Sequence, residues 1–211
     1  MRTMKKMLLV SMFQNVANIL RTVEPDLKNK TVTYIPTASI VEKLGFFVKI
    51  EKWKLKRLGL IVDELEISTS SYETIKDTLQ RNDFIYITGG NTFFLLQELK
   101  RTGADKLLIE EINKGKLYIG ESAGAIVVAS DIAYSAEMDH VEKAPYLKDC
   151  SGLSLIDFYV VPHYKNWEMG KAAEKIIDTY STRLNLKVIT DNQAILIEDS
   201  EFKILDKNKD F

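Results

Sequence analysis

The sequence predicts an α/β fold with a single doubly wound, mostly parallel sheet and helices on both faces. Two observations support this fold class. Short apolar runs alternate with longer amphipathic segments, and repeated strand–helix–strand units need crossovers that give one parallel sheet. Most of the apolar runs also lack the polar alternation of a one-sided sheet, which is typical of strands covered on both faces. The 211 residues are sufficient for one domain, spanning 1–211, with a full core.

The expected strands are short runs rich in Val, Ile, Leu, Tyr and Phe. In chain order they are Met7–Val10, Thr31–Ile35, Leu60–Leu65, Phe84–Thr88, Leu117–Ile119, Phe158–Val161 and Leu186–Ile189, followed by a hairpin of Ala194–Ile197 and Phe202–Leu205. The expected helices are Phe13–Val23, Val41–Leu58, Tyr72–Gln80, Thr92–Leu99, Ala104–Lys114 and Trp167–Thr182. In the fifth helix, for example, Leu107, Leu108 and Ile112 share one face and the charged residues lie elsewhere.

Composition excludes several classes of protein. Lys and Arg number 29 and Asp and Glu 30, a net charge of -1, so bulk charge does not recruit nucleic acid or an acidic membrane. One cysteine, Cys150, cannot form an internal disulfide or a thiolate zinc cluster. Two histidines, His140 and His163, are too few for a histidine-rich metal site, so any histidine base is one of these two.

The apolar run Met7–Phe13 follows Lys5 and Lys6 and superficially resembles a short signal peptide. It ends at Gln14 and Asn15 with no Ala-x-Ala site after it, so a first buried strand is the better interpretation. No apolar stretch approaches the ~18 residues that a membrane span needs. Together with the single cysteine, these features favour a cytoplasmic enzyme or binding protein.

Residues able to do chemistry follow the strands of the predicted sheet. In an open parallel sheet, ligands bind outside the carboxyl ends of the strands. The segments at those ends include Pro36–Ser39, Gly89–Asn91, Gly120–Gly124, Pro162–Tyr164 and Thr190–Asn192. A glycine pair, a serine, a histidine and an aspartate therefore converge on one edge of the sheet, where we expect the functional site.

The first of these segments to suggest a reaction is Gly120–Gly124, which fits Gly-x-Ser-x-Gly between a strand and a helix. A nucleophile elbow turns sharply at the serine, so its neighbours must be small, as Gly120, Ala123 and Gly124 are. Ser122 would then lie at a helix N-terminus, where backbone N–H groups can stabilise an oxyanion. The alternative is a tight turn without chemistry.

A second turn, Gly89–Asn91, also connects a strand to a helix. It could supply another N–H donor to the oxyanion hole or let the backbone approach a substrate closely, and the alternative is a simple turn with positive φ. The turn is too short for Gly-x-Gly-x-x-Gly, and the chain has no Walker sequence. Binding of dinucleotides or nucleoside triphosphates therefore loses support.

A serine nucleophile needs a base and an orienting acid. His163 follows a strand and is favoured over His140, which lies in a charged loop. Asp191 lies at the next strand end and is favoured as the acid, with Asp139 and Asp131 as alternatives.

Four segments together resemble the peptidase E family of serine peptidases, which includes cyanophycinases. They are Tyr34–Ser39, Tyr86–Thr92, Gly120–Ala125 and Pro162–Tyr164, in the family's order and over most of the chain. The resemblance implies a fold similar to class I glutamine amidotransferases, with serine as the nucleophile and no metal or organic cofactor.

The resemblance also implies roles for individual residues. It assigns Ser122 as nucleophile, His163 as its base, and the backbone N–H groups of Gly90 and Ala123 as the oxyanion hole. For the acid, Asp191 best matches the family's C-terminal position. Asp139 is the nearest match to an aspartate after the nucleophile and is the alternative third member.

The family's best-known activity is removal of an N-terminal aspartate from dipeptides and short peptides, with a basic side chain holding the aspartate carboxylate. No arginine closely follows His163, so Lys165 or Lys171 would substitute, although lysine lacks the bidentate fork. Asn91 and Lys165 are the expected substrate-binding residues.

The leading hypothesis is a serine peptidase that hydrolyses short peptides, with N-terminal Asp-Xaa dipeptides as one substrate class. An α/β-hydrolase-type esterase is the alternative enzyme, because choosing Asp139 restores its Ser, Asp, His order. A non-catalytic binding protein on the same fold is the third hypothesis. The irregular segment 131–155 is where a lid would lie.

Overall fold

The structure is a computed structural model that describes residues 4–42 and 44–209. The ends of the predicted domain, 1–3 and 210–211, and Lys43 of the predicted helix Val41–Leu58 lie outside the described residues. The strands are β1 (Lys6–Val10), β2 (Thr31–Ile35), β3 (Ile61–Glu64), β4 (Phe84–Ile87), β5 (Leu117–Glu121), β6 (Tyr159–Val161), β7 (Leu186–Val188), β8 (Gln193–Glu198) and β9 (Glu201–Asp206). The helices are α1 (Phe13–Val16), α2 (Ile19–Val23), α3 (Gly45–Arg57), α4 (Tyr72–Arg81), α5 (Thr92–Thr102), α6 (Ala104–Asn113), α7 (Ala123–Ile126) and α8 (Gly170–Tyr180), with short 3-10 helices η1 (Thr37–Ser39), η2 (Ala133–Glu137) and η3 (Val141–Lys143).

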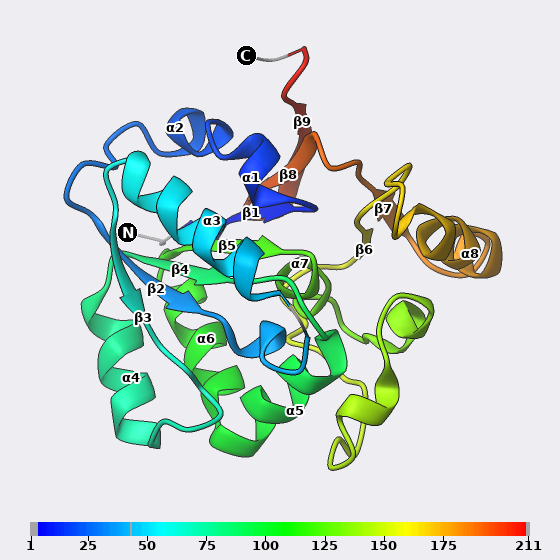
Figure 1. Ribbon diagram of the computed structural model, residues 1–211, viewed down its shortest axis with the longest axis horizontal. Coiled ribbons are helices and arrows are strands. Elements are labelled where there is room, and N and C mark those ends of the chain that lie inside the picture. The colour runs from blue at the N-terminus through cyan, green and yellow to red at the C-terminus, as the bar shows by residue number, and fades with distance from the viewer. Residues whose placement is uncertain (1–3, 43, 210–211) are drawn as a thin grey trace.

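Within those residues, the central sheet has seven strands in the order β3-β2-β4-β5-β1-β8-β9 (Figure 1). The first five strands pair in parallel, and β8 runs antiparallel to both β1 and β9. Successive side chains of a strand point to opposite faces. Met7 and Leu9 of β1 belong to the core with α4, α5 and α6, whereas Leu8 and Val10 belong to the core with α1, α2 and α3.

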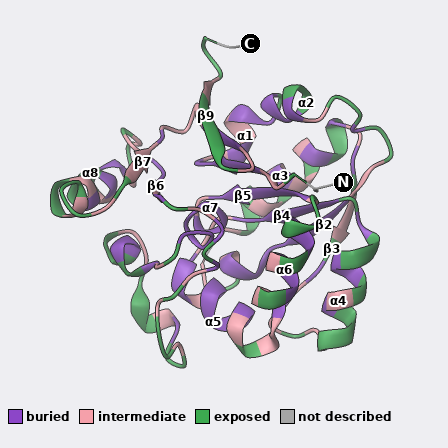
Figure 2. Ribbon diagram, turned by 180° about the vertical axis from the view of Figure 1, so that it is seen from behind, coloured by how far each residue is buried: buried purple, intermediate pink, exposed green. Residues whose placement is uncertain are grey.

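Both faces of this sheet are therefore covered by helices, and Figure 2 shows buried strands between helices whose outer faces are exposed. The mostly parallel sheet and the two helical layers confirm the predicted fold class. The chain differs from the prediction in the pairing of β6 and β7 and in the bounds of its helices.

The strand register brings several loops to one edge of the sheet. Val10 lies opposite Glu121, and Ile87 lies opposite Gly120. The segments that follow β1, β4 and β5 therefore begin side by side. This edge positions the candidate site.

The prediction that Phe158–Val161 and Leu186–Ile189 join the main sheet is wrong. β6 and β7 instead pair in parallel with each other, as a separate two-stranded sheet, beside α8 in Figure 1. The reason is competition for the edge of β1: all five residues of β1 pair with the β8–β9 hairpin. The carboxyl ends of β6 and β7 nevertheless still meet, because the two strands run in parallel.

The predicted helices also differ from the observed ones at their ends: α4 and α5 end later than predicted and α6 ends one residue earlier. The segment Phe13–Val23 is divided into α1 and α2, because the Leu20 and Arg21 N–H groups bond three residues back, to Ala17 and Asn18, instead of four. Helices α3 and α8 both begin later than predicted, at glycines. In residues 4–42 and 44–209, no helix has the length and apolar character needed to cross a membrane.

We predict that Gly124→Ala and Gly45→Ala shift stability in opposite directions. A Cβ on Gly124 would lie 2.6 Å from the Ile87 carbonyl oxygen, whereas one on Gly45 would meet nothing within 4 Å. Overpacking at Gly124 should cost about 1–3 kcal/mol of unfolding free energy. Gly45→Ala, in the first turn of α3, should add up to about 1 kcal/mol. Urea unfolding of both variants measures this, and equal effects would contradict the packing seen around α7.

Candidate active site

Ser122 lies at the sharp turn between β5 and α7. Its backbone has φ 46° and ψ -103°, a conformation that a residue with a side chain adopts only under strain. The turn is close-packed, since a Cβ on Gly120 would lie 2.4 Å from the Gly124 carbonyl oxygen. The Ser122 N–H donates to the Val10 carbonyl across 2.9 Å, which joins the turn to β1. The small residues in Gly120–Gly124 are therefore a requirement of this backbone.

His163 approaches Ser122 from the two-stranded sheet. It follows β6, and its Nε2 lies 2.9 Å from Ser122 Oγ. The residue is 8% exposed and has φ 63°, again in the left-handed region. The Tyr164 N–H bonds to the Ile189 carbonyl, and the Ile189 N–H bonds to the Val161 carbonyl. The ends of β6 and β7 are thus held together.

Asp191, which follows β7, lies behind His163. Its Oδ1 is 2.9 Å from His163 Nδ1. Partial burial acts to raise the pKa of Asp191, but hydrogen bonds from His163, Ser11 and Asn166 outweigh it and lower the pKa to about 2. The group is therefore a carboxylate at neutral pH. A carboxylate at Nδ1 favours the tautomer that keeps a proton there and leaves Nε2 free to accept the serine proton.

Two residues of this network were not predicted. Ser11 follows β1; its Oγ donates to Asp191 Oδ1 across 2.5 Å and accepts the His163 backbone N–H across 2.8 Å. Asn166 Nδ2 donates to Asp191 Oδ2 across 2.6 Å, while its Oδ1 accepts the N–H groups of Glu168 and Met169. Ser11 could have been found, because it directly follows the first strand at the same edge. Nothing in the sequence marks Asn166.

The turn after β4 packs directly against Ser122. A Cβ on Gly89 would lie 3.3 Å from Ser122 Cβ. Gly90 has φ 136°, and a Cβ there would lie 2.1 Å from the Ala38 carbonyl oxygen, so only glycine fits. Ala123 is the first residue of α7, and a first-turn N–H has no acceptor within its own helix. Ala123 directly follows Ser122 in the chain, and Gly90 directly follows Gly89, the glycine that packs against Ser122.

Asn91 supports this turn rather than reaching outward. Its Oδ1 accepts the Phe94 N–H as the N-cap of α5, and its Nδ2 donates to the His140 carbonyl. Its own N–H bonds to Ala38. The side chain is fully buried. We therefore assign Asn91 to holding the Gly89–Asn91 turn, and not to the substrate contact that the sequence suggested.

The alternative acids and base contact other groups. Asp139 Oδ2 accepts both the N–H and the hydroxyl of Thr92, at 3.0 and 2.5 Å, and burial raises the pKa of Asp139. Asp131 accepts the Ala133 N–H. His140 is largely exposed and lies 3.0 Å from Glu142. Among the described residues, Asp191 is the carboxylate hydrogen-bonded to His163.

Lys165 follows His163 by two residues in the chain. Its side chain is exposed, with Nζ 5.3 Å from the centroid of the Tyr164 ring, and it forms no ion pair with any described residue. Lys171 is exposed on α8. The Lys165 ammonium is therefore available to an anionic ligand.

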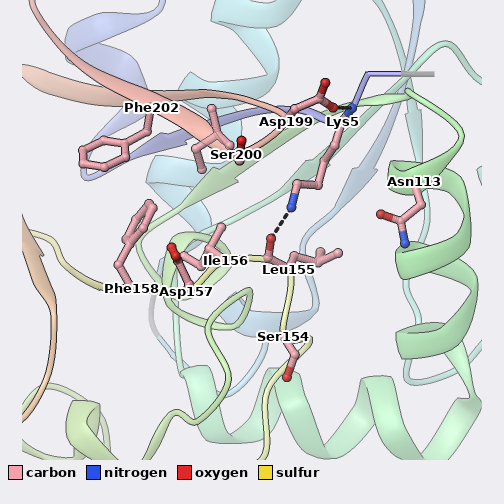
Figure 3. A pocket seen from close by; sticks show the side chains of 11 residues that line it. Lys5, Asn113, Ser154, Leu155, Ile156, Asp157, Phe158, Asp199, Ser200 and Phe202 are labelled. Atoms are coloured by element: carbon pink, nitrogen blue, oxygen red, sulfur yellow. Dashed lines mark hydrogen bonds between the residues drawn. The ribbon is translucent and has the colours of Figure 1, made fainter. Parts of the chain in front are cut away.

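A cavity of about 730 Å³ lies beside Lys5, which precedes β1 (Figure 3), whereas Ser122 lies at the other end of the sheet, where its N–H bonds to Val10 at the end of β1. Its lining comes from the start of β1, the end of α6, the segment before β6 and the β8–β9 turn: Lys5, Asn113, Ser154, Leu155, Ile156, Asp157, Phe158, Ile197, Asp199, Ser200 and Phe202. In Figure 3, Lys5 Nζ points to the Leu155 carbonyl, 2.5 Å away. The cavity lining does not include Ser122, His163 or Asp191. The candidate site is therefore identified by the hydrogen bonds among these three side chains and not by the size of a cavity.

A pair of buried carboxyl groups lies behind the nucleophile. Glu121, next to Ser122, accepts the Tyr86 hydroxyl at 2.6 Å and the Phe13 N–H at 2.8 Å. Glu51 on α3 accepts the Tyr34 hydroxyl at 2.6 Å. Burial raises the pKa of both carboxyl groups, and the neighbouring Glu51 charge raises the pKa of Glu121 further. The two carboxyl groups therefore keep a proton up to a higher pH than two separate glutamates in water would.

Known proteins resemble this chain in both sequence and structure. The model of peptidase family S51 matches residues 7–205. An uncharacterized peptidase of Listeria innocua, Lin0382, is 50% identical over 198 residues, which cover 94% of this chain and 95% of that protein. Peptidase E of Haemophilus influenzae is 28% identical over 174 residues, covering 79% and 76%. A crystal structure of a candidate peptidase E from Listeria monocytogenes EGD-e superposes with a TM-score of 0.93 at 48% identity, covering 97% and 99%.

We predict that Glu121→Gln makes stability less dependent on pH. A raised pKa means that the folded protein binds more protons than the unfolded chain, so unfolding free energy falls as pH rises from the unfolded value of about 4.3 through the folded pKa. Glutamine keeps the shape and an acceptor for Phe13 but cannot ionise. Urea unfolding at several values between pH 5 and pH 8 should show a shallower decline in the variant. Equal declines would contradict proton retention at Glu121.

Proposed function

The chain belongs to peptidase family S51 and is a serine-type peptidase, and from this premise we propose that it hydrolyses short peptides through an acyl-enzyme on Ser122. One observation carries the proposal. Ser122 Oγ lies 2.9 Å from His163 Nε2, and His163 Nδ1 lies 2.9 Å from Asp191 Oδ1. This continuous hydrogen-bonded chain is the arrangement needed to activate a serine.

In the first half-reaction, Ser122 Oγ attacks the peptide carbonyl carbon while His163 Nε2 takes the hydroxyl proton. The Asp191 carboxylate stabilises the imidazolium that forms. The carbonyl oxygen becomes an oxyanion, and the N–H groups of Gly90 and Ala123 donate to it. When the C–N bond breaks, His163 returns its proton to the leaving amine. The acyl group then remains on Ser122 as an ester.

In the second half-reaction, water takes the place of the amine. His163 Nε2 accepts a proton from the water as its oxygen attacks the ester carbonyl. The same two N–H groups stabilise the second oxyanion. The Ser122–acyl bond then breaks, and the proton on His163 returns to Ser122 Oγ. The cycle consumes one water per peptide bond and returns Ser122, His163 and Asp191 to their starting states.

For the substrate, we propose short peptides with an N-terminal aspartate, the activity that the resemblance to peptidase E implies. Lys165 supports this choice, because it follows His163 by two residues in the chain and its ammonium is exposed. Among the described residues, no carboxylate forms an ion pair with it. A single lysine gives a weaker and less directional contact than an arginine fork. We therefore expect a preference for aspartate rather than an absolute requirement.

The esterase alternative has less support. It depends on Asp139 as the third member, and that carboxylate bonds to Thr92 at the start of α5. Asp191, which follows His163 in the chain, bonds to the imidazole instead. The geometry therefore favours the Ser, His, Asp order.

We predict that Ser122→Ala and His163→Ala each abolish peptidase activity while the fold is retained. Asp191→Asn should lower kcat by about 10³–10⁴-fold, because the wrong histidine tautomer is then stabilised. Asp139→Asn, the matched control, should retain most activity. The measurement combines a fluorophosphonate label mapped by mass spectrometry with turnover of aminoacyl anilides and a simple ester. Label absent from Ser122, or Asp139→Asn as impaired as Asp191→Asn, would contradict the assignment.

A second prediction concerns Lys165. Lys165→Met should raise KM for an aspartyl anilide by about tenfold, the equivalent of roughly 1.4 kcal/mol for one charge-assisted contact. KM for an alanyl anilide should be unchanged, because that substrate has no carboxylate to hold. Lys171→Met serves as the control and should leave both values unaltered. Equal KM changes for the two anilides in Lys165→Met would rule out a specific carboxylate contact.

A further inference from the structure

Ser11 connects the two sheets at the proposed reaction centre. Ser122 belongs to the end of the seven-stranded sheet, whereas His163 and Asp191 follow the strands of the two-stranded sheet. Ser11 directly follows β1, in the middle of the large sheet, and contacts both residues of the small one. At 1% exposure its side chain is inaccessible to solvent. Its polar contacts are therefore with protein.

The proton and at least one lone pair of this hydroxyl are bonded to protein groups. A serine hydroxyl has one proton to donate and two lone pairs to accept with. The proton goes to Asp191 Oδ1, 2.5 Å away. One lone pair accepts the His163 backbone N–H at 2.8 Å, and the oxygen lies 3.1 Å from His163 Nδ1. Removal of this one oxygen would leave the buried His163 N–H without that acceptor and would take away one of the three donors to the Asp191 carboxylate.

The position of Ser11 relative to the nucleophile is also held from both sides. The residue before it, Val10, accepts the Ser122 N–H at 2.9 Å. Two residues after it, the Phe13 N–H donates to Glu121 Oε1 at 2.8 Å. The β1–α1 turn is thus attached to two consecutive residues of the elbow. A shift of Ser11 would have to disturb Ser122 as well.

The backbone of His163 explains why such a contact is needed. Its φ of 63° lies in a region that costs a non-glycine residue about 1–3 kcal/mol unless its surroundings enforce it. The Ser11 hydroxyl accepts the N–H of that same residue. It therefore holds both the backbone that aims the imidazole and the carboxylate that orients it.

We propose that Ser11 is a positioning residue that keeps the His163–Asp191 unit aligned on Ser122. The proposal rests on the proposed acyl-enzyme function. Ser11 does not reach the reacting atoms, so it acts on proton transfer and not on substrate binding. Loss of the hydroxyl should therefore lower kcat and leave KM unchanged, since a small misalignment of catalytic groups costs up to about 10²-fold in rate.

The test compares Ser11→Ala with Ser135→Ala. Ser135 is also a fully buried serine, but among the described residues its hydroxyl bonds only to the Ile132 carbonyl, at 2.8 Å. Ser11→Ala should lower kcat by about 10- to 100-fold, slow fluorophosphonate labelling of Ser122 in proportion, and leave KM within about twofold of wild type. Ser135→Ala should lose unfolding free energy without these kinetic effects. Ser11→Cys, which has a similar size but is a weak donor, should fall between Ser11→Ala and wild type.

A second readout does not depend on turnover. Because the Ser11 hydroxyl is one of the donors that lower the pKa of Asp191, the carboxyl ¹³C titration of Asp191 should move upward in Ser11→Ala and stay in place in Ser135→Ala. Wild-type kcat, or an unmoved Asp191 titration, in a folded Ser11→Ala protein would overturn the proposal while Ser122→Ala remains inactive. Activity retained in Ser122→Ala would instead overturn the proposed function itself.

Discussion

The contact between Ser122 and His163 is the interaction on which the rest of the site depends, because it joins two separate sheets. Ser122, the proposed nucleophile, lies at the carboxyl end of β5 in the large sheet, and His163, the proposed base, follows β6 of the small one. Each residue has a backbone in the left-handed region. Neither conformation is favourable by itself, so the packing around both residues must hold them. The glycines at 89, 90, 120 and 124 supply the close packing on one side, and the pairing of β6 with β7 supplies it on the other.

Polar groups buried at this junction set its charge state. Three donors, from His163, Ser11 and Asn166, stabilise the Asp191 carboxylate, so a negative charge remains next to the imidazole at neutral pH. The Glu51 and Glu121 carboxyl groups have the reverse tendency, because burial raises the pKa of both and the Glu51 charge raises the pKa of Glu121 further. The pKa of Asp191 and the pKa values of Glu51 and Glu121 thus shift in opposite directions, because hydrogen bonds outweigh burial at Asp191 and burial dominates at the two glutamates. Asp191 therefore supplies a carboxylate on the side of the elbow where His163 lies.

Most of the fold follows from hydrophobic patterning. Most of the site follows from the rule that functional groups gather where the carboxyl ends of parallel strands meet. The runs Met7–Val10 and Phe84–Thr88 are apolar at every position or nearly so, which only strands covered on both faces explain, and β1 and β4 are buried accordingly. Ser122, His163 and Asp191 come together because each follows a strand. The rule succeeds even for β6 and β7, which leave the main sheet, because they remain parallel to each other.

Which edge a three-residue strand joins depends on competition with the β8–β9 hairpin, a tertiary effect without a local signal. The hydrogen bonds of Asn166 and Asp139 could not be predicted for the same reason, because their partners lie on segments distant in sequence.

A crystal structure of the protein inactivated by a peptidyl phosphonate would test the central claim most directly. The account predicts phosphorus bonded to Ser122 Oγ, with a phosphonyl oxygen about 2.7–3.1 Å from the N–H groups of both Gly90 and Ala123. His163 should remain between the adduct and Asp191, with Ser11 still bonded to both. An adduct on another residue, or a phosphonyl oxygen directed away from Gly90 and Ala123, would contradict it.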